Sequence, residues 1–442
     1  MATSTEKPST HTSSTHTAGT VSVAEHLDRI LSAVSALPAV TRPLGEALGL
    51  TLAVEVVALV DVPSFDNSAM DGYAVLHADA ATASADSPVS LRVVADLPAG
   101  ASEDPTLQPG EAARIMTGAP LPDSADCVVP VEDTDQHGGA NTDGGSGTVQ
   151  IFAAPKPTAH IRHIGTDARA GEVVLRAGIC LNARDLSAAA ATGSHELTVI
   201  PAPRVAVLST GSELCKPGEP LARGQIHDSN SLLIASLVTE CGGIPVLVGS
   251  VPDDDDALRA AFGKNAPHVD AFITSGGVSV GAFDVVKAVL APVGVWFGSV
   301  RMQPGKPQGF GQWPSAADAS DCTATSGTPI FALPGNPVSV FVSFEQFVRP
   351  ALMKMQGRDD VYRPALKAAA ATSWRSPVGR AQFMPAVVET LPDGRVTVRP
   401  ASEGGSGSYL VASLAGANAL AAVPESVTEV REGDLLDVTL VP

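Results

Sequence analysis

Between Arg204 and Val348, short apolar runs alternate with longer amphipathic stretches, and this alternation constrains the fold more than any other feature of the sequence. Strands are predicted at Arg204 to Leu208, Pro245 to Val248, Ala271 to Thr274 and Pro329 to Leu333. Helices are predicted at Ser231 to Thr239, Asp254 to Phe262, Asp284 to Leu290 and Pro337 to Val348. Strands that alternate with helices of this length favour right-handed crossovers and a mostly parallel sheet with helices on both faces. The sequence therefore predicts a central α/β domain.

The segments on either side of this domain predict β structure. Short Val-rich runs separated by Gly, Pro and Asp predict strands at Leu52 to Val60, Val89 to Val94, Glu172 to Leu175, Val396 to Val398 and Leu436 to Val441. Apolar residues at helical spacing predict one amphipathic helix from Val23 to Val34. Gly138 to Gly147 is rich in Gly, Asn and Asp, which is typical of an exposed hairpin tip.

Length and charge exclude several classes of protein. At 442 residues the chain can form about three domains of ordinary size. Its formal net charge of −19 and the lack of any Lys or Arg run argue against a nucleic-acid partner. No apolar stretch reaches the length of a membrane span, and the Ser- and Thr-rich first residues lack the apolar core of a secretory signal. We therefore expect a disordered N-terminal tail and a cytoplasmic protein without a membrane partner. The 5 widely spaced cysteines agree with a reducing compartment.

The loop after the predicted strand Ala271 to Thr274 reads Ser275-Gly276-Gly277-Val278-Ser279-Val280-Gly281. It contains G-x-S-x-G, but the hydrolases with that motif place a histidine after the serine, and the last histidine here is His268. The Lys-Ser/Thr pair of a P-loop is also missing. The glycines serve either a tight turn or the binding of a phosphate at the start of the next helix.

Three acidic residues follow predicted strands at the edge of the sheet where ligands bind in such folds. They are Glu213, Asp253 and Asp284. Their oxygens could hold Mg²⁺ against a substrate phosphate. For the neighbouring Asp254 to Asp256 the simpler interpretation is capping of a helix. A further loop, Leu333-Pro334-Gly335-Asn336-Pro337, holds its backbone between two prolines.

Taken together, several motifs resemble the molybdopterin molybdenumtransferase family, which comprises bacterial MoeA proteins and the gephyrin E domain. The matching stretches, in family order, are Phe65 to Ala74, Arg114 to Pro120, Ser209 to Gly211, Ser275 to Gly281, Pro304 to Pro307 and Leu333 to Ser339. The resemblance implies an elongated homodimer, in which the α/β domain of one subunit faces the small C-terminal β domain of the other across the active cleft. The implied division is a tail (1–21), a linking and dimerisation domain (22–62 and 172–202), a β-rich domain (63–171), the α/β domain (203–362) and a C-terminal β domain (363–442).

The implied reaction inserts molybdate into adenylylated molybdopterin, with Mg²⁺-dependent cleavage of the phosphoanhydride and release of AMP. Contacts with the molybdopterin adenylyltransferase and with recipient molybdoenzymes are implied as well. By resemblance the catalytic residues are Asp71, Thr117, Asp167, Glu213 and Asp284, and the metal ligands are Glu213, Asp253 and Asp284. Substrate binding falls by resemblance to Ser275, Gly276, Gly277, Ser279, Pro334, Gly335, Asn336 and Pro337.

Molybdate would be bound by Lys306, Arg380 and Ser408, which supply charge and hydrogen bonds to an oxyanion. Many relatives carry lysines where this chain has Ser299 and Gln303. In an extended segment Arg301 shares a face with both positions, so we expect Arg301 to restore one positive charge.

Two other functions remain open. The chain could be a molybdopterin adenylyltransferase, since the α/β domain also resembles that family, or a non-enzymatic scaffold of the gephyrin type. A pure scaffold has no need for carboxylates in a cleft. It is therefore disfavoured by the acidic residues Asp71, Glu213, Asp253 and Asp284.

Overall fold

The computed structural model describes residues 20–136, 147–278, 284–314, 327–403 and 405–441. The chain forms two compact units, of which one comprises Met1–Val40 with Ile200–Pro442 and the other Thr41–Val199. Among the described residues, no helix is both long enough and apolar enough to cross a membrane. The predicted hairpin tip at Gly138 to Gly147 lies almost entirely outside the described residues.

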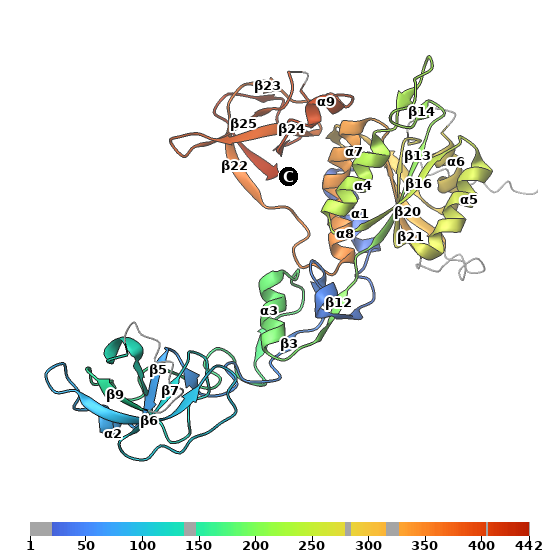
Figure 1. Cartoon of the computed structure of the whole chain (residues 1–442). Helices are drawn as coiled ribbons and strands as arrows, with labels where there is room; N and C mark the ends of the chain where they lie inside the picture. The colour runs from blue at the N-terminus through green and yellow to red at the C-terminus, as the bar shows by residue number, and fades with distance from the viewer. Residues whose placement is uncertain (1–19, 137–146, 279–283, 315–326, 404, 442) are drawn as a thin grey trace, which may run out of the picture. The chain divides into compact units, whose positions relative to one another are not determined.

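A six-stranded sheet forms the centre of the first unit (Figure 1). Its strands, in spatial order, are β16 (Ile244–Val251), β13 (Arg204–Thr210), β17 (Ala271–Ser275), β21 (Gly327–Leu333), β20 (Pro307–Pro314) and β18 (Trp296–Ser299). The first four run parallel, which confirms the mostly parallel sheet. The last two are antiparallel and were not predicted. The segment that joins β18 to β20 is too short for a crossover, so these strands can pair only in the antiparallel direction.

Helices cover both faces of this sheet, as predicted (Figure 1). On one face lie α1 (Val23–Ala33), α4 (Asn230–Glu240), α7 (Pro337–Ser343), the π-helical turn η5 (Phe344–Val348) and α8 (Arg349–Met355). The other face is covered by α5 (Asp255–Asn265) and α6 (Val285–Leu290). The last predicted helix thus runs on to Met355. Short 3-10 turns occur in both units, at η1 (Leu44–Glu46), η2 (Val131–Asp133), η3 (Ala266–His268) and η4 (Ala291–Val293).

Helix α1 is confirmed and has a capping box between Ser22 and Glu25. Its Ile30 is buried in the core of the α/β domain, and the backbone of Val21 bridges to Val300. The structure therefore places residues 20–40 with the α/β domain, whereas the sequence assigned Val21 to the tail and the following residues to the linking domain. Helix α1 packs against α8, which lies far along the chain.

The C-terminal segment forms a second six-stranded sheet in the same unit. In spatial order its strands are β19 (Met302–Gln303), β24 (Ala381–Thr390), β25 (Val396–Pro400), β22 (Ala365–Ala370), β28 (Leu435–Leu440) and β26 (Ala419–Val423). An additional pairing of β24 with β26 closes it into a barrel-like sheet. Smaller elements are β14 (Leu214–Cys215), β15 (Ile226–His227), β23 (Trp374–Arg375), β27 (Glu429–Val430) and α9 (Val411–Leu414). The expected C-terminal β structure is confirmed.

The second unit contains a five-stranded sheet. Its strands, in spatial order, are β8 (Cys127–Pro130), β5 (Gly72–Val75), β7 (Glu111–Ile115), β6 (Val89–Leu97) and β9 (Gly147–Ile151). Shorter strands are β1 (Val40–Pro43), β2 (Thr51–Leu52), β3 (Val56–Val57), β4 (Asn67–Ser68), β10 (Ile161–Arg162), β11 (Val173–Leu175) and β12 (Glu196–Ile200). The run Leu52 to Val60 is therefore split rather than one strand.

The second unit also contains the helices α2 (His77–Ala80) and α3 (Ala183–Ala191), which the sequence did not predict. Asn182 caps α3, and Asp185 completes a capping box three residues later. That pair is a helix-start signal that the Ala-rich, weakly periodic sequence after it obscured.

Candidate functional site

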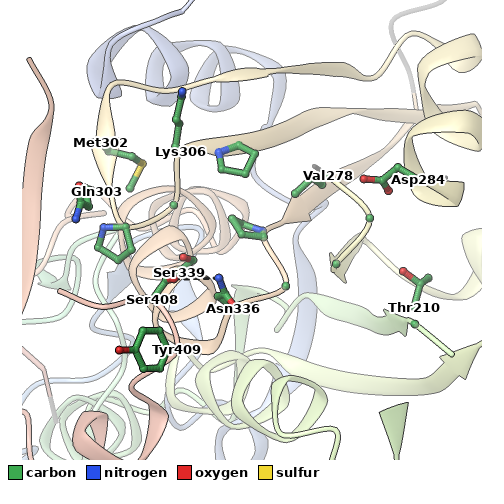
Figure 2. Close-up of a pocket in the computed structure, with 18 of the residues that line it drawn as sticks. Thr210, Val278, Asp284, Met302, Gln303, Lys306, Asn336, Ser339, Ser408 and Tyr409 are labelled. Atoms are coloured by element: carbon green, nitrogen blue, oxygen red, sulfur yellow. Dashed lines mark hydrogen bonds between the residues drawn. The ribbon is translucent and has the colours of Figure 1, made fainter. Parts of the chain in front are cut away.

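A pocket of about 890 Å³ opens at the carboxyl ends of the parallel strands. Loops after β13, β17 and β21 line it, together with the segment 302–307 and the C-terminal residues Arg380 and Ser406 to Tyr409. Figure 2 shows Gln303 and Lys306 on one side, Thr210, Val278 and Asp284 on the other, and Asn336, Ser339 and Ser408 between them. The parallel-sheet topology thus places the pocket where open α/β sheets bind ligands.

The C-terminal β domain reaches this pocket within one chain. Strand β19 pairs with β24, and the backbone N–H of Val338 donates to the carbonyl oxygen of Ser408 at 3.0 Å. The expectation that the α/β domain of one subunit faces the C-terminal β domain of the other stays a prediction. Pairing of β19 with β24 brings the two domains of the same chain together.

Glycines shape the wall formed by the loops after β17 and β21. Gly276 and Gly277 have φ values of +89° and +72°, which side chains rarely adopt. A Cβ on Gly277 would overlap Val286 and lie 2.8 Å from Oδ1 of Asp284. A Cβ on Gly335 would lie 3.5 Å from the Cα of Gly276. The two loops therefore come close enough to expose their backbone to a ligand.

Of the remaining residues predicted to bind substrate, some line the pocket and others do not. Pro334 and Asn336 line the pocket. The Ser275 side chain is buried, with its Oγ 3.1 Å from the Oγ of Ser209, and is absent from the pocket lining. Pro337 is the first residue of α7 and does not line the pocket either. Ser279 lies outside the described residues.

The three carboxylates predicted as metal ligands all line the pocket, but they do not form a closed metal site. Oδ2 of Asp253 accepts a hydrogen bond from the N–H of Ser212 at 3.0 Å, which ties the loop of Asp253 to that of Glu213. Within the described ranges, no group of three His, Cys, Asp or Glu side chains is close enough to hold a metal ion. Mg²⁺ commonly takes only one or two carboxylates and completes its shell with substrate phosphate and water, so the oxygen donors still fit it.

The capping interpretation is confirmed for Asp254. This residue is the N-cap of α5, and its Oδ1 accepts a hydrogen bond from the N–H of Ala257 at 2.8 Å. Asp255 and Asp256 lie in the first turn, where negative charge complements the helix dipole.

Two cations line the pocket without a carboxylate partner. Lys306 and Arg380 are exposed, and neither forms an ion pair with any carboxylate in the described part of the chain. Ser408 lies between the domains, with its Oγ accepting a hydrogen bond from Nδ2 of Asn336 at 2.9 Å. The pocket therefore offers two positive charges and a hydroxyl in addition to its three carboxylates.

The expected face shared by Arg301, Ser299 and Gln303 requires an extended segment. The chain bends at Arg301 instead, and the N–H of Met302 donates to the carbonyl oxygen of Val300 at 2.8 Å. Nε of Arg301 donates to Oε2 of Glu425 at 3.0 Å, and Arg301 does not line the pocket. Within this chain the structure does not bring Arg301 to the molybdate residues.

Several pocket residues were not identified from the sequence. They are Thr210, Val278, Met302, Gln303, Ser339, Ser406 and Tyr409. Thr210 and Ser339 belong to the motifs Ser209 to Gly211 and Leu333 to Ser339, which the sequence analysis had already identified. Membership of these glycine-containing motifs could have indicated that both residues line the pocket. Tyr409 directly follows Ser408 and is 73% exposed, which nothing in the local sequence indicates.

In the second unit, the structure brings together the motifs that contain Asp71 and Thr117. Oδ1 of Asp71 accepts hydrogen bonds from the N–H of Thr117 at 2.7 Å and from its Oγ1 at 2.8 Å. The backbone bond, followed by the hydroxyl bond, lowers the pKa of Asp71 below its usual value. The Asp71 side chain is thereby held in its ionised form and in a fixed orientation.

The loop that contains Asp167 is anchored in the same unit. Asp66 accepts a hydrogen bond from the N–H of Ile164 at 2.7 Å, and its Oδ2 lies 2.9 Å from Nδ1 of His163. The backbone bond and then the His163 bond lower the pKa of Asp66. Asp167 itself is exposed, and its N–H donates to the carbonyl oxygen of Val62 at 2.9 Å. Asp66 thus positions this loop.

The α/β fold with a charged pocket at the carboxyl ends of its strands, together with the barrel-like C-terminal sheet, defines a multidomain ligand-binding protein. Comparison with known protein families identifies the family within this class. Residues 21–193 match the family described as "MoeA N-terminal region (domain I and II)", residues 206–354 the "probable molybdopterin binding domain", and residues 367–441 the "MoeA C-terminal region (domain IV)".

Curated and solved relatives agree with these matches. "Molybdopterin molybdenumtransferase 2" of Mycobacterium tuberculosis is 42% identical over 424 residues, covering 94% of this chain and 98% of the relative. "Molybdopterin molybdenumtransferase" of Nostoc sp. is 38% identical, covering 88% of this chain and 86% of the relative. A molybdopterin biosynthesis MoeA protein of Pyrococcus horikoshii has a crystal structure with a TM-score of 0.76, 30% identity and coverage of 96% of this chain and 99% of that chain. The chain belongs to the molybdopterin molybdenumtransferase family.

Proposed function

We propose that this chain inserts molybdenum, supplied as molybdate, into adenylylated molybdopterin and releases AMP with the molybdenum cofactor. The names of its relatives and its family membership support the transfer of molybdenum to molybdopterin. The observation that carries the finer proposal is the division of charge in the pocket. The carboxylates come from loops of the α/β domain, whereas Lys306 follows β19 and Arg380 directly precedes β24 of the C-terminal sheet. Neither cation has an ion pair in the described part of the chain.

This division suits a substrate with a phosphoanhydride at one end and a site of oxyanion attack at the other. Lys306, Arg380 and Ser408 would hold molybdate through charge-assisted hydrogen bonds. The backbone around Gly276, Gly277 and Gly335 would accommodate the molybdopterin end, because no side chain stands between it and the ligand.

The oxygen donors Glu213, Asp253 and Asp284 would hold Mg²⁺. Bound there, the ion would neutralise phosphate charge and polarise the phosphoanhydride bond. The chain's own contribution is to present these carboxylates on loops that Asp253 and Ser212 tie together.

Molybdate-dependent release of AMP from adenylylated molybdopterin tests the proposal. Wild type is expected to release AMP only when molybdate and Mg²⁺ are present, and Arg380→Ala to require more molybdate. Arg399→Gln removes the same charge from an exposed pair with Glu389 and serves as the matched control. Release of AMP without molybdate, or none at all, would contradict the proposal. Adenylylation of molybdopterin by ATP without use of molybdate would identify the adenylyltransferase instead.

We further infer a homodimer that works in the cytoplasm, meets the molybdopterin adenylyltransferase and passes its product to molybdoenzymes. The exposed apolar side chains of Leu48, Val54, Leu59 and Val173 in the second unit support an interface there. The free thiols of Cys127, Cys180, Cys215 and Cys241 suit a reducing compartment. Sedimentation equilibrium tests the dimer, which a monomer at micromolar concentration would exclude.

A further inference from the structure

A second, smaller hollow of about 100 Å³ lies beside η5 and α8, and it shares no residue with the large pocket. Its wall includes the apolar side chains of Leu27 and Pro350. Its polar lining includes Glu345, Arg349 and Arg363. Neither the resemblance nor the proposed reaction uses these residues.

The only carboxylate in the lining of this hollow is fully engaged by one arginine. Nε of Arg363 donates to Oε2 of Glu345 at 2.7 Å, and its Nη2 donates to Oε1 at 3.0 Å. The side chain of Glu345 is only 3% exposed. Such a two-bond fork uses both oxygens of Glu345 and leaves the carboxylate little capacity to neutralise a second cation.

Arg349 is that second cation. Its Nη1 donates to the carbonyl oxygen of Val361 at 3.0 Å, and it ion-pairs with no carboxylate among the residues described. Burial, and after it the positive charge of Arg363, lowers the pKa of Arg349. Glu240 also acts on Arg363, and Arg358 on Arg349, so three arginines face two carboxylates here. The cluster therefore keeps an excess of one positive charge beside a hollow with partly apolar walls. Partial burial of an uncompensated charge costs free energy that a bound anion would recover.

We propose that this hollow binds one small tetrahedral oxyanion, of the phosphate or sulfate type, with Arg349 as its main ligand. Guanidinium groups match such ions because their N–H donors form a planar fork. The hollow has the volume of about three waters, which admits one such group and little more. The π-helical turn η5 ends directly before Arg349, and π turns often occur at functional sites.

Titration calorimetry with inorganic phosphate, at constant ionic strength in potassium chloride, tests the proposal on the full chain. Wild type is expected to bind phosphate, and Arg349→Gln to bind at least tenfold more weakly. Arg399→Gln, which changes the net charge equally on an exposed strand, is expected to bind like wild type.

The results that overturn the proposal are equally specific. Unchanged binding by Arg349→Gln, or no binding by wild type, would refute it. If Arg349→Gln fails to fold by circular dichroism, Arg349→Lys keeps the charge without the fork and is expected to bind more weakly than wild type; equal binding would again refute the site. The oxyanion could belong to a phosphate ester or be a free ion, and glycerol 3-phosphate distinguishes the two. Binding as tight as that of phosphate assigns a phosphate ester as the ligand, and weaker binding assigns the free ion.

Discussion

Replacing Gly72 by alanine tests how the fold of the second unit holds Asp71. Gly72 directly follows Asp71 and begins β5, which pairs with β8 on one side and β7 on the other. A Cβ at this position would overlap the carbonyl oxygen of Val129 and lie 2.9 Å from its carbonyl carbon. The obstacle is backbone in the neighbouring strand, so no side-chain rotation relieves it.

The cost follows from this geometry. Carbon atoms pack at about 3.5 to 4.0 Å, and the carbonyl oxygen lies still nearer to the added Cβ than the carbonyl carbon does, so β5 and β8 must separate locally by about an ångström or more. Overpacking of this kind costs about 1 to 3 kcal/mol. Loss of about two backbone hydrogen bonds near Gly72 adds about 1 kcal/mol each. Together these give about 3 to 5 kcal/mol, a large fraction of the stability of an ordinary domain.

Urea unfolding followed by circular dichroism measures this change in the free energy of unfolding. Gly147→Ala is the matched control, because Gly147 lies in β9 of the same sheet, has no positive φ, and a Cβ there meets nothing within 4 Å. That variant is expected to stay within about 0.5 kcal/mol of wild type. Equal stability of the two variants would refute the steric reasoning.

Three further predictions follow from single contacts. Lys306→Ala is expected to raise the KM for molybdate about tenfold with a smaller effect on kcat, measured by AMP release, and an unchanged KM would remove Lys306 from the molybdate site. The hydrogen bonds from Thr117 lower the pKa of Asp71, so the carboxylate persists above that pKa and is lost as pH falls through it. Thr117→Val removes the hydroxyl donor and is expected to shift the acid limb of the pH–rate profile to higher pH, whereas an unshifted limb would contradict a catalytic role for ionised Asp71. Arg363→Met leaves the buried Glu345 carboxylate unpaired and is expected to cost about 3 to 5 kcal/mol in urea unfolding, and a loss below about 1 kcal/mol would contradict this.

Local patterns in the sequence sufficed for the α/β domain. The strand that ends at Leu333 and the helix that starts after Asp254 follow from hydrophobic period and capping residues, both of which act within a few positions. The same reasoning missed α3, whose Ala-rich sequence has little periodicity. It also missed the antiparallel strands β18 and β20, because strand direction depends on the length of the connection.

The candidate site was predicted in part. Glu213 and Asp253 line the pocket because each follows a strand that the sequence predicted, whereas Lys306 was indicated only by the motif Pro304 to Pro307. Arg301 shows the limit of this reasoning. The predicted alternation needs extended backbone, but the chain bends at Arg301. Its guanidinium instead pairs with Glu425, a carboxylate 124 positions away.

Residue types and short spacings suffice to predict the parallel strands and helices of the α/β domain, the family and the chemistry available in the motifs. Which distant groups meet depends on the tertiary structure. Asp71 and Thr117 are 46 positions apart and share two hydrogen bonds. The C-terminal domain completes the pocket of its own chain through β19 and β24. Contacts of this kind result from packing and strand pairing over the whole chain, which no local pattern encodes.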